Sequence, residues 1–138
     1  MIKRQKRWIY NSPKPRKPKV PEGVMTGVEI RATELVEAVL KPQHLKVPPE
    51  DERFNYIVDI HTKWYRNYFY FCATYACPGP NALSPFLETN FARMEYVGGK
   101  GRFNLSFMRY TGEWIELHHN LSLEECLAAI RDEPHFYP

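Results

Sequence analysis

The sequence has few of the features that mark secreted and membrane proteins. Its three cysteines, Cys72, Cys77 and Cys126, are an odd number without a secretory context, which favours free thiols over a disulfide framework. No apolar run approaches the roughly 18 residues that a membrane helix needs. The apolar triplet Trp8-Ile9-Tyr10 is too short for the core of a signal peptide. We therefore expect a cytoplasmic protein that makes no contact with membranes.

Acidic residues are missing from the first 21 positions, and this absence is the most informative feature of the chain. The whole chain has 19 Lys and Arg against 16 Asp and Glu, and eight of the basic residues lie in this first segment. Residues 22–138 therefore keep 11 basic and 16 acidic residues, a net charge of −5. A segment with charge of a single sign is typical of a binding arm.

Residues 1–24 are predicted to form an extended, Pro-rich arm. Pro13, Pro15, Pro18 and Pro21 lack amide donors and have a fixed φ, which favours polyproline II over helix or strand. The remaining residues, 25–138, are enough for a single domain with its own core. The sequence thus predicts a basic arm joined to one domain.

Two helices are predicted at the two ends of this domain. The first begins near Thr26, because Thr26-Gly27-Val28-Glu29 has the spacing of a capping box, and an apolar stripe follows. It is expected to stop at Lys41, because a residue before proline disfavours the helical conformation. The second begins with the capping box Ser122-Leu123-Glu124-Glu125 and ends before Pro134.

Strands are predicted between the two helices. In the first strand, residues expected to be buried alternate with polar ones. The buried face is predicted to consist of Phe54, Tyr56, Val58, Ile60, Thr62 and Trp64. The second strand is apolar on both faces. Short glycine-containing turns join the last three strands, and turns this short make neighbouring strands antiparallel. The predicted fold class is a two-layer α+β fold, a five-stranded antiparallel meander covered by an N-terminal and a C-terminal helix. The predicted strands span 54–64, 68–76, 88–97, 102–110 and 113–119.

The run from Phe54 to Pro85, FNYIVDIHTKWYRNYFYFCATYACPGPNALSP, resembles a family of small bacterial proteins known only as a domain of unknown function. The later stretches FARMEYVGG, GRFNLSFMRYTGEW and LSLEECLAAIRDEPHF are similar to the same family. The resemblance covers nearly the whole chain. It implies a bacterial protein with a single domain, and it brings no activity, cofactor or catalytic residue with it.

The arm is the first candidate binding element. Its basic side chains can neutralise phosphates and release counterions, and Trp8 and Tyr10 can stack on unpaired bases. The same charge also suits an acidic protein surface, including the body of this chain, and Pro15-Arg16-Lys17-Pro18 matches a PxxP ligand. RNA, DNA or an acidic protein surface is therefore the predicted partner. The predicted contacts are Lys3, Arg4, Lys6, Arg7, Trp8, Tyr10, Lys14, Arg16, Lys17 and Lys19.

The polar face of the sheet is the second candidate. An acid, a base and a thiol on one face, Asp59, His61 and Cys72, could support acid–base or nucleophilic chemistry, which would require a lowered thiol pKa. Antiparallel sheets commonly expose a polar face without any such role, and this is the simpler interpretation. Strand parity predicts that Lys63, Thr74, Arg93, Glu95, Ser106, Glu116 and His118 share this face.

No metal site and no cofactor is predicted. Cys72 and Cys77, with His61, His118 and His119 as further ligands, lack the two close ligand pairs of structural zinc sites. The side chains of the two cysteines are also expected to point to opposite faces of the sheet.

Two loops carry weaker signals. Gly98-Gly99-Lys100-Gly101 has strands on both sides, so a hairpin turn is favoured over a phosphate-binding loop. The loop 77–87 holds Cys77, Asn81 and Ser84 and is the best place for a site without a recognisable motif.

These observations together predict a non-enzymatic binding protein, which the basic arm attaches to nucleic acid or to a ribonucleoprotein. The first alternative is a subunit of a larger assembly that uses the arm and the aromatic sheet for protein contacts. An enzyme that uses the polar sheet face is the least favoured alternative.

Overall fold

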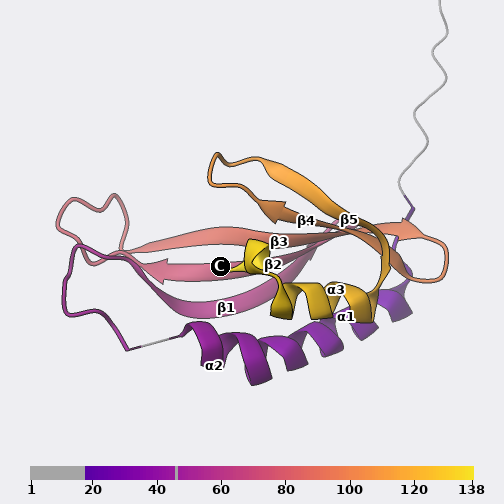
Figure 1. Cartoon of the computed structure of the whole chain (residues 1–138), viewed down its shortest axis with the longest axis horizontal. Coiled ribbons are helices and arrows are strands. Elements are labelled where there is room, and N and C mark those ends of the chain that lie inside the picture. Colours follow the sequence, from indigo (N-terminus) through magenta and orange to yellow (C-terminus); the bar gives the residue numbers. More distant parts are fainter. Residues whose placement is uncertain (1–17, 46) are drawn as a thin grey trace, which may run out of the picture.

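The computed structural model describes residues 18–45 and 47–138, which form one antiparallel sheet covered by helices (Figure 1). The strand order in the sheet is β1-β2-β3-β4-β5, so each strand pairs with its neighbours in the sequence. The predicted five-stranded meander is therefore confirmed. The strands are β1 (Tyr56–Tyr65), β2 (Tyr68–Ala76), β3 (Phe86–Gly98), β4 (Arg102–Met108) and β5 (Trp114–Ser122).

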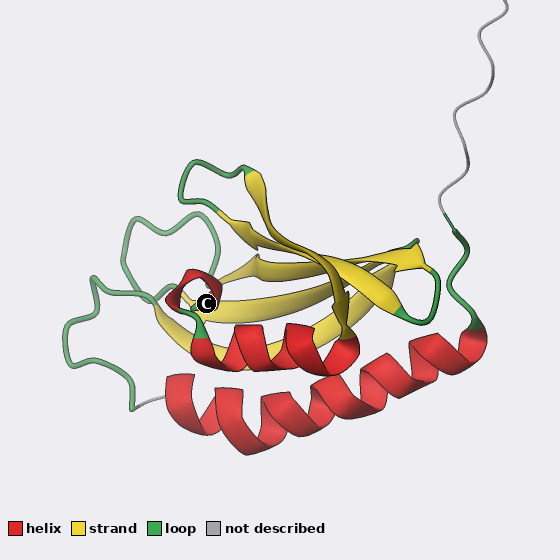
Figure 2. Cartoon of the chain, turned by 45° about the vertical axis from the view of Figure 1, so that its right-hand side comes forward, coloured by secondary structure: helices red, strands yellow, loops and turns green. Residues whose placement is uncertain are grey.

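Helices from the two ends of the domain lie along one face of this sheet (Figure 2). They are α1 (Glu22–Leu35) with its extension, the π-helical segment η1 (Val36–Leu40) and the short helix α2 (Lys41–His44), and the C-terminal α3 (Leu123–Asp132), which precedes the turn η2 (Pro134–Phe136). The predicted α+β fold is thus confirmed. None of the helices in the described ranges is long and apolar enough to cross a membrane. The core between helices and sheet includes Val28, Ala32, Val36, Leu40, Ile60, Phe69, Phe71, Met94, Phe103, Leu105 and Ile130.

The N-terminal helix begins earlier than the sequence predicts. Its first residue is Glu22, its N-cap is Pro21, and no side chain caps it, so the capping box predicted at Thr26 is wrong. The carbonyl of Pro21 accepts the first helical hydrogen bond, from the Met25 amide at 3.0 Å. Pro21 is in the extended conformation that suits a residue preceding a helix, and burial of Val20 holds the chain in place before it. Residues 22–24, predicted as arm, therefore belong to the helix.

The same helix continues past the predicted stop at Lys41. Proline lacks an amide donor, and its ring crowds the preceding turn of a regular α-helix. Here the turn before Pro42 is π-helical, over Val36–Leu40, and the chain then completes one further α-helical turn to His44. The wider π-turn accommodates the proline, which local preferences alone would not suggest.

The first strand departs from the predicted alternation at its start. The pairing of β1 with β2 is irregular between Ile57 and Asp59, so Val58 lies in a β-bulge. Val58 is exposed, Phe54 lies before the strand and is exposed, and Ile57 packs against the core instead. The prediction of a buried face is therefore correct at Ile60 and wrong at Phe54 and Val58.

The other predicted elements are close to those observed. The second strand has the predicted bounds, the fourth has the predicted start, and the remaining ends of the third to fifth strands differ from prediction by one to three residues. The capping box at α3 is present, because the Glu125 amide donates to Ser122 Oγ at 3.2 Å and the Ser122 amide donates to Glu125 Oε1 at 2.9 Å. The helix ends at Asp132, before Pro134 as predicted.

Candidate functional site on the outer face of the sheet

The outer face of the sheet, which we define as the face opposite the helices, carries most of the polar residues that strand parity predicts to lie together. In the pairing of β1 with β2, His61 is opposite Cys72, Asp59 opposite Thr74 and Lys63 opposite Tyr70. Paired residues of adjacent strands project to the same side of a sheet. The predicted grouping of Asp59, His61, Lys63, Cys72 and Thr74 on one face is thus confirmed as geometry.

The prediction for the rest of this face is correct except at one position. The pairings continue from Tyr70 to Arg93, Ser106 and Glu116, and from Tyr68 to Glu95. His118 is instead opposite the core residue Leu105, and its Nε2 donates to Glu133 Oε1 at 2.9 Å. The register of β4 with β5 shifts between Leu105 and Ser106, and one inserted residue reverses the faces of those that follow.

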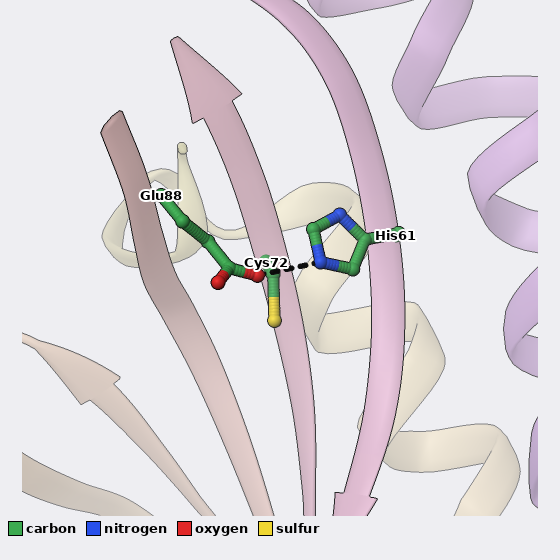
Figure 3. Close-up of side chains that lie close together, drawn as sticks. All are labelled: His61, Cys72 and Glu88. Atoms are coloured by element: carbon green, nitrogen blue, oxygen red, sulfur yellow. Dashed lines mark hydrogen bonds and ion pairs between the residues drawn. The ribbon is translucent and has the colours of Figure 1, made fainter. Parts of the chain in front are cut away.

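Three potential ligands for a metal ion meet on this face. His61 from β1, Cys72 from β2 and Glu88 from β3 have donor atoms that all lie within 4.8 Å of one another (Figure 3). His61 Nε2 donates a hydrogen bond to Glu88 Oε1 at 2.7 Å. Sequence reasoning missed Glu88, because its place beside Cys72 depends on the register of β3 rather than on spacing in the chain.

Charged neighbours flank both members of the His61–Glu88 pair. Asp59 Oδ2 lies 4.0 Å from His61 Nδ1, and Lys63 Nζ lies 3.8 Å from Glu88 Oε2. Asp59 also pairs with Lys41 of α2, whose Nζ is 3.4 Å from Asp59 Oδ1. The pair is therefore held from both sides by alternate residues of the edge strand β1.

The Cys72 thiol lies beneath these groups and is completely buried. Burial raises the pKa of Cys72 to about 11, the nearby Glu88 carboxylate acts in the same direction, and only Lys63 opposes it. A nucleophilic cysteine needs the opposite shift. The raised pKa disfavours Cys72 as a nucleophile, so an enzyme that uses this face stays the least favoured hypothesis.

A cation–aromatic cluster occupies the same face next to this group. The Arg93 guanidinium carbon lies 4.7 Å from the ring centroids of both Tyr68 and Trp114. The rings of Tyr70 and Trp114 also meet, with centroids 5.9 Å apart, although two strands separate β2 from β5. No local pattern predicts this contact, because it joins residues more than 40 positions apart.

The loop 77–87 lines an open groove of about 610 Å³ at one end of the sheet. Cys77, Asn81 and Ser84 all border it, together with apolar side chains such as Leu83 and Phe86. Its described lining contains no histidine and no acid, so the residues predicted there have no general base beside them.

The glycine segment 98–101 is the hairpin turn that the sequence predicts. Gly98, Gly99 and Gly101 all have positive φ, which tight turns between strands require. A Cβ added at Gly98 would lie only 3.4 Å from Pro18 Cγ, so the root of the arm packs against this turn. Lys19 is exposed and Val20 is buried. The other predicted arm contacts, Lys3 to Lys17 with Trp8 and Tyr10, lie outside the described residues.

The molecule is thus an α+β domain with one helix-covered face and one polar, partly aromatic face. The chain belongs to the family described as Domain of unknown function (DUF3024), whose model matches residues 20–138. This bears out the resemblance to a family of unknown function that the sequence shows, and the match begins at Val20, the first buried residue in the part of the chain that the structure describes. No curated protein and no solved structure matches the chain.

Proposed function

We propose that this chain is a cytosolic binding protein, which its basic N-terminal arm attaches to nucleic acid or to a ribonucleoprotein. The observation that carries the proposal is the anchoring of the arm at its root. Pro18 packs against Gly98, and Val20 is 6% exposed in the core. Residues 18–20 therefore join the arm to the domain at a fixed point beside the β3–β4 turn, where Lys19 and Lys100 are both exposed.

Electrostatics favour the arm, rather than the sheet, as the phosphate-binding element. Residues 22–138 have a net charge of −5, and the first 21 residues contribute eight positive charges. The outer face itself carries more acids than bases, with Asp59, Glu88, Glu95 and Glu116 against Lys63 and Arg93. A phosphate backbone is repelled by such a face, whereas the arm neutralises it and releases its counterions.

A truncation that begins at Pro18 tests this proposal. It removes seven of the eight basic residues of the arm but keeps the Pro18 contact, the buried Val20 and the Pro21 cap of α1. Binding to fluorescent single- and double-stranded RNA and DNA is measured at low salt for the full chain and the truncation. We expect the full chain to bind and the truncated chain to lose the binding while its circular dichroism and thermal unfolding stay unchanged. Equal binding by both forms would refute the role of the arm.

The second candidate is a protein-interaction subunit, and the groove lined by the 77–87 loop favours it. Leu83, Phe86 and Leu87 expose 105%, 57% and 50% of their surface there. Exposed apolar side chains that gather in one place are typical of protein contacts. This role predicts that neither form of the chain binds nucleic acid in the experiment above.

A further inference from the structure

We infer that His61, Cys72 and Glu88 form a binding site for a divalent transition-metal ion, with Zn²⁺ the best match to their donor atoms. The three residues come from three adjacent strands, β1, β2 and β3, so the backbone of the sheet fixes their relative positions. The site is separate from the arm and does not depend on the proposed function.

The spacing of the donors fits an ion with only small movements. With metal–ligand bonds of about 2.0–2.3 Å in a tetrahedral site, the donor atoms lie about 3.4–3.6 Å from one another. His61 Nε2 and Glu88 Oε1 are 2.7 Å apart, and the atoms of all three residues lie within 4.8 Å. Side-chain rotations that shift each donor by about 1 Å are therefore enough to make room for the ion.

The donor set selects the class of metal. An imidazole nitrogen and a thiolate sulfur favour zinc and similar transition metals over Mg²⁺ and Ca²⁺, which prefer oxygen ligands. Binding of the ion displaces the proton of the Cys72 thiol to solvent, and the resulting thiolate together with the carboxylate of Glu88 balances the charge of a divalent ion. Three protein ligands leave the fourth tetrahedral position for water or another small ligand.

The neighbours of the ligands have the arrangement of an outer coordination shell. Metal-bound histidines commonly have a carboxylate beside the second ring nitrogen, and Asp59 Oδ2 lies 4.0 Å from His61 Nδ1. Carboxylates that bind a metal commonly accept hydrogen bonds from neighbouring groups as well. Here Lys63 Nζ lies 3.8 Å from Glu88 Oε2, which is the carboxylate oxygen that does not bond to His61. Each exposed ligand thus has a charged neighbour on β1, close enough to form a hydrogen bond after a small side-chain movement.

Asn90 provides a second, independent observation. It pairs directly with Cys72 in the β2–β3 register, so it lies on the same face of the sheet. Its Oδ1 is buried and has no hydrogen-bond partner among the described residues. A buried acceptor without a partner is costly, and a metal-bound water in the fourth position would supply the missing donor.

Two other His–Glu pairs in the domain differ from the His61–Glu88 pair in the number of potential metal ligands nearby. His118 Nε2 lies 2.9 Å from Glu133 Oε1, and His119 Nε2 lies 3.1 Å from Glu116 Oε2. Among the described residues, only the His61–Glu88 pair has a third metal-ligating atom within reach. The arm offers no competing donors, because residues 1–17 contain no His, Cys, Asp or Glu.

The test uses the full chain without a polyhistidine tag, with Zn²⁺ and Co²⁺ as the probes. We expect one equivalent of Zn²⁺ to bind, and Co²⁺ to give a thiolate-to-cobalt charge-transfer band in the near ultraviolet. His61→Gln and Cys72→Ala should each weaken Zn²⁺ binding on the order of 100-fold or more, and Glu88→Gln by about 10-fold or more. Competition with a chromophoric chelator measures these affinities.

His119→Gln and Cys77→Ser are the matched controls, since they remove the same side-chain types elsewhere, and both should leave Zn²⁺ affinity unchanged. Circular dichroism checks that each variant is folded. If Cys72→Ala does not fold, His61→Gln and Glu88→Gln decide the outcome together with the cobalt band, because the side chains of His61 and Glu88 are partly exposed and can be replaced without opening the core. Zn²⁺ affinity that is unaffected by His61→Gln and Glu88→Gln, or a cobalt complex without the thiolate band, would overturn the inference. A hydrogen-bonded His–Glu pair over a buried thiol, without a ligand, would then be the correct description.

Discussion

Alkylation of the three cysteines under native conditions measures how inaccessible the Cys72 thiol is. Cys72 is completely buried and its pKa is raised to about 11 by burial, compared with 9.0 for an ordinary thiol. Cys126 is also completely buried, and burial raises its pKa to about 12. Cys77 is partly exposed in the 77–87 loop. We expect Cys77 to react first by a wide margin.

The magnitude of this difference follows from the cost of access. The reagent can reach Cys72 only after local opening, and the opened thiol is exposed, so it loses the burial that raised its pKa. The raised pKa and the cost of opening therefore describe the same protection. An opening that costs about 2 kcal/mol reduces the rate about 30-fold. Cys72 should therefore react on the order of 30-fold or more slowly than Cys77.

Iodoacetamide labelling followed by peptide mass spectrometry provides the assay. In the native protein the Cys72 rate should rise about tenfold per pH unit between pH 8 and pH 10, because only the thiolate reacts and its fraction grows until the pH passes the folded-state pKa of about 11. In denaturant the three thiols should react at similar rates, which is the control. Native labelling of Cys72 as fast as that of Cys77 would refute this reasoning and would reopen a nucleophilic role for Cys72.

Three further outcomes are expected. Ser122→Ala should lower the free energy of unfolding by about 1 kcal/mol, measured by urea denaturation, because it removes the cap of α3; an unchanged midpoint would show that the cap contributes nothing. A chain that begins at Glu22 should be less stable than one that begins at Pro18 by about 1.5–3 kcal/mol, because it lacks the buried Val20, and equal thermal unfolding of the two would contradict the anchoring of the arm. Trp8→Ala should weaken binding to single strands by about 1–3 kcal/mol and leave duplex binding nearly unchanged, if Trp8 stacks on bases; an equal loss on both would exclude stacking.

Much of the fold could be predicted because it is specified by local signals. The apolar run of β2 and the Ser122 capping box of α3 identify those elements from a few neighbouring residues. Where the prediction was wrong, packing overrides a local preference. The turn before Pro42 becomes π-helical rather than ending the helix, and the helix begins at Glu22 without a side-chain cap.

The candidate metal site could be predicted only in part, since parity placed His61 and Cys72 on one face but could not place Glu88. Its position depends on a register shift between Phe71 and Cys72 in the pairing of β2 with β3. A similar shift moves His118 to the helix-covered face. Bulges have no strong signature in the sequence, and each one reverses the facing of the residues beyond it.

The dependence of nucleic-acid affinity on salt tests the central claim most directly. The full chain is compared with a variant of equal length in which the seven basic residues of positions 1–17 are replaced by glutamine. If six to eight basic residues contact phosphates, the logarithm of the association constant should fall against the logarithm of salt concentration with a slope between about −4 and −7. The glutamine variant should bind weakly with a slope near zero. Equal slopes for the two proteins, or no binding by either, would contradict attachment through the arm.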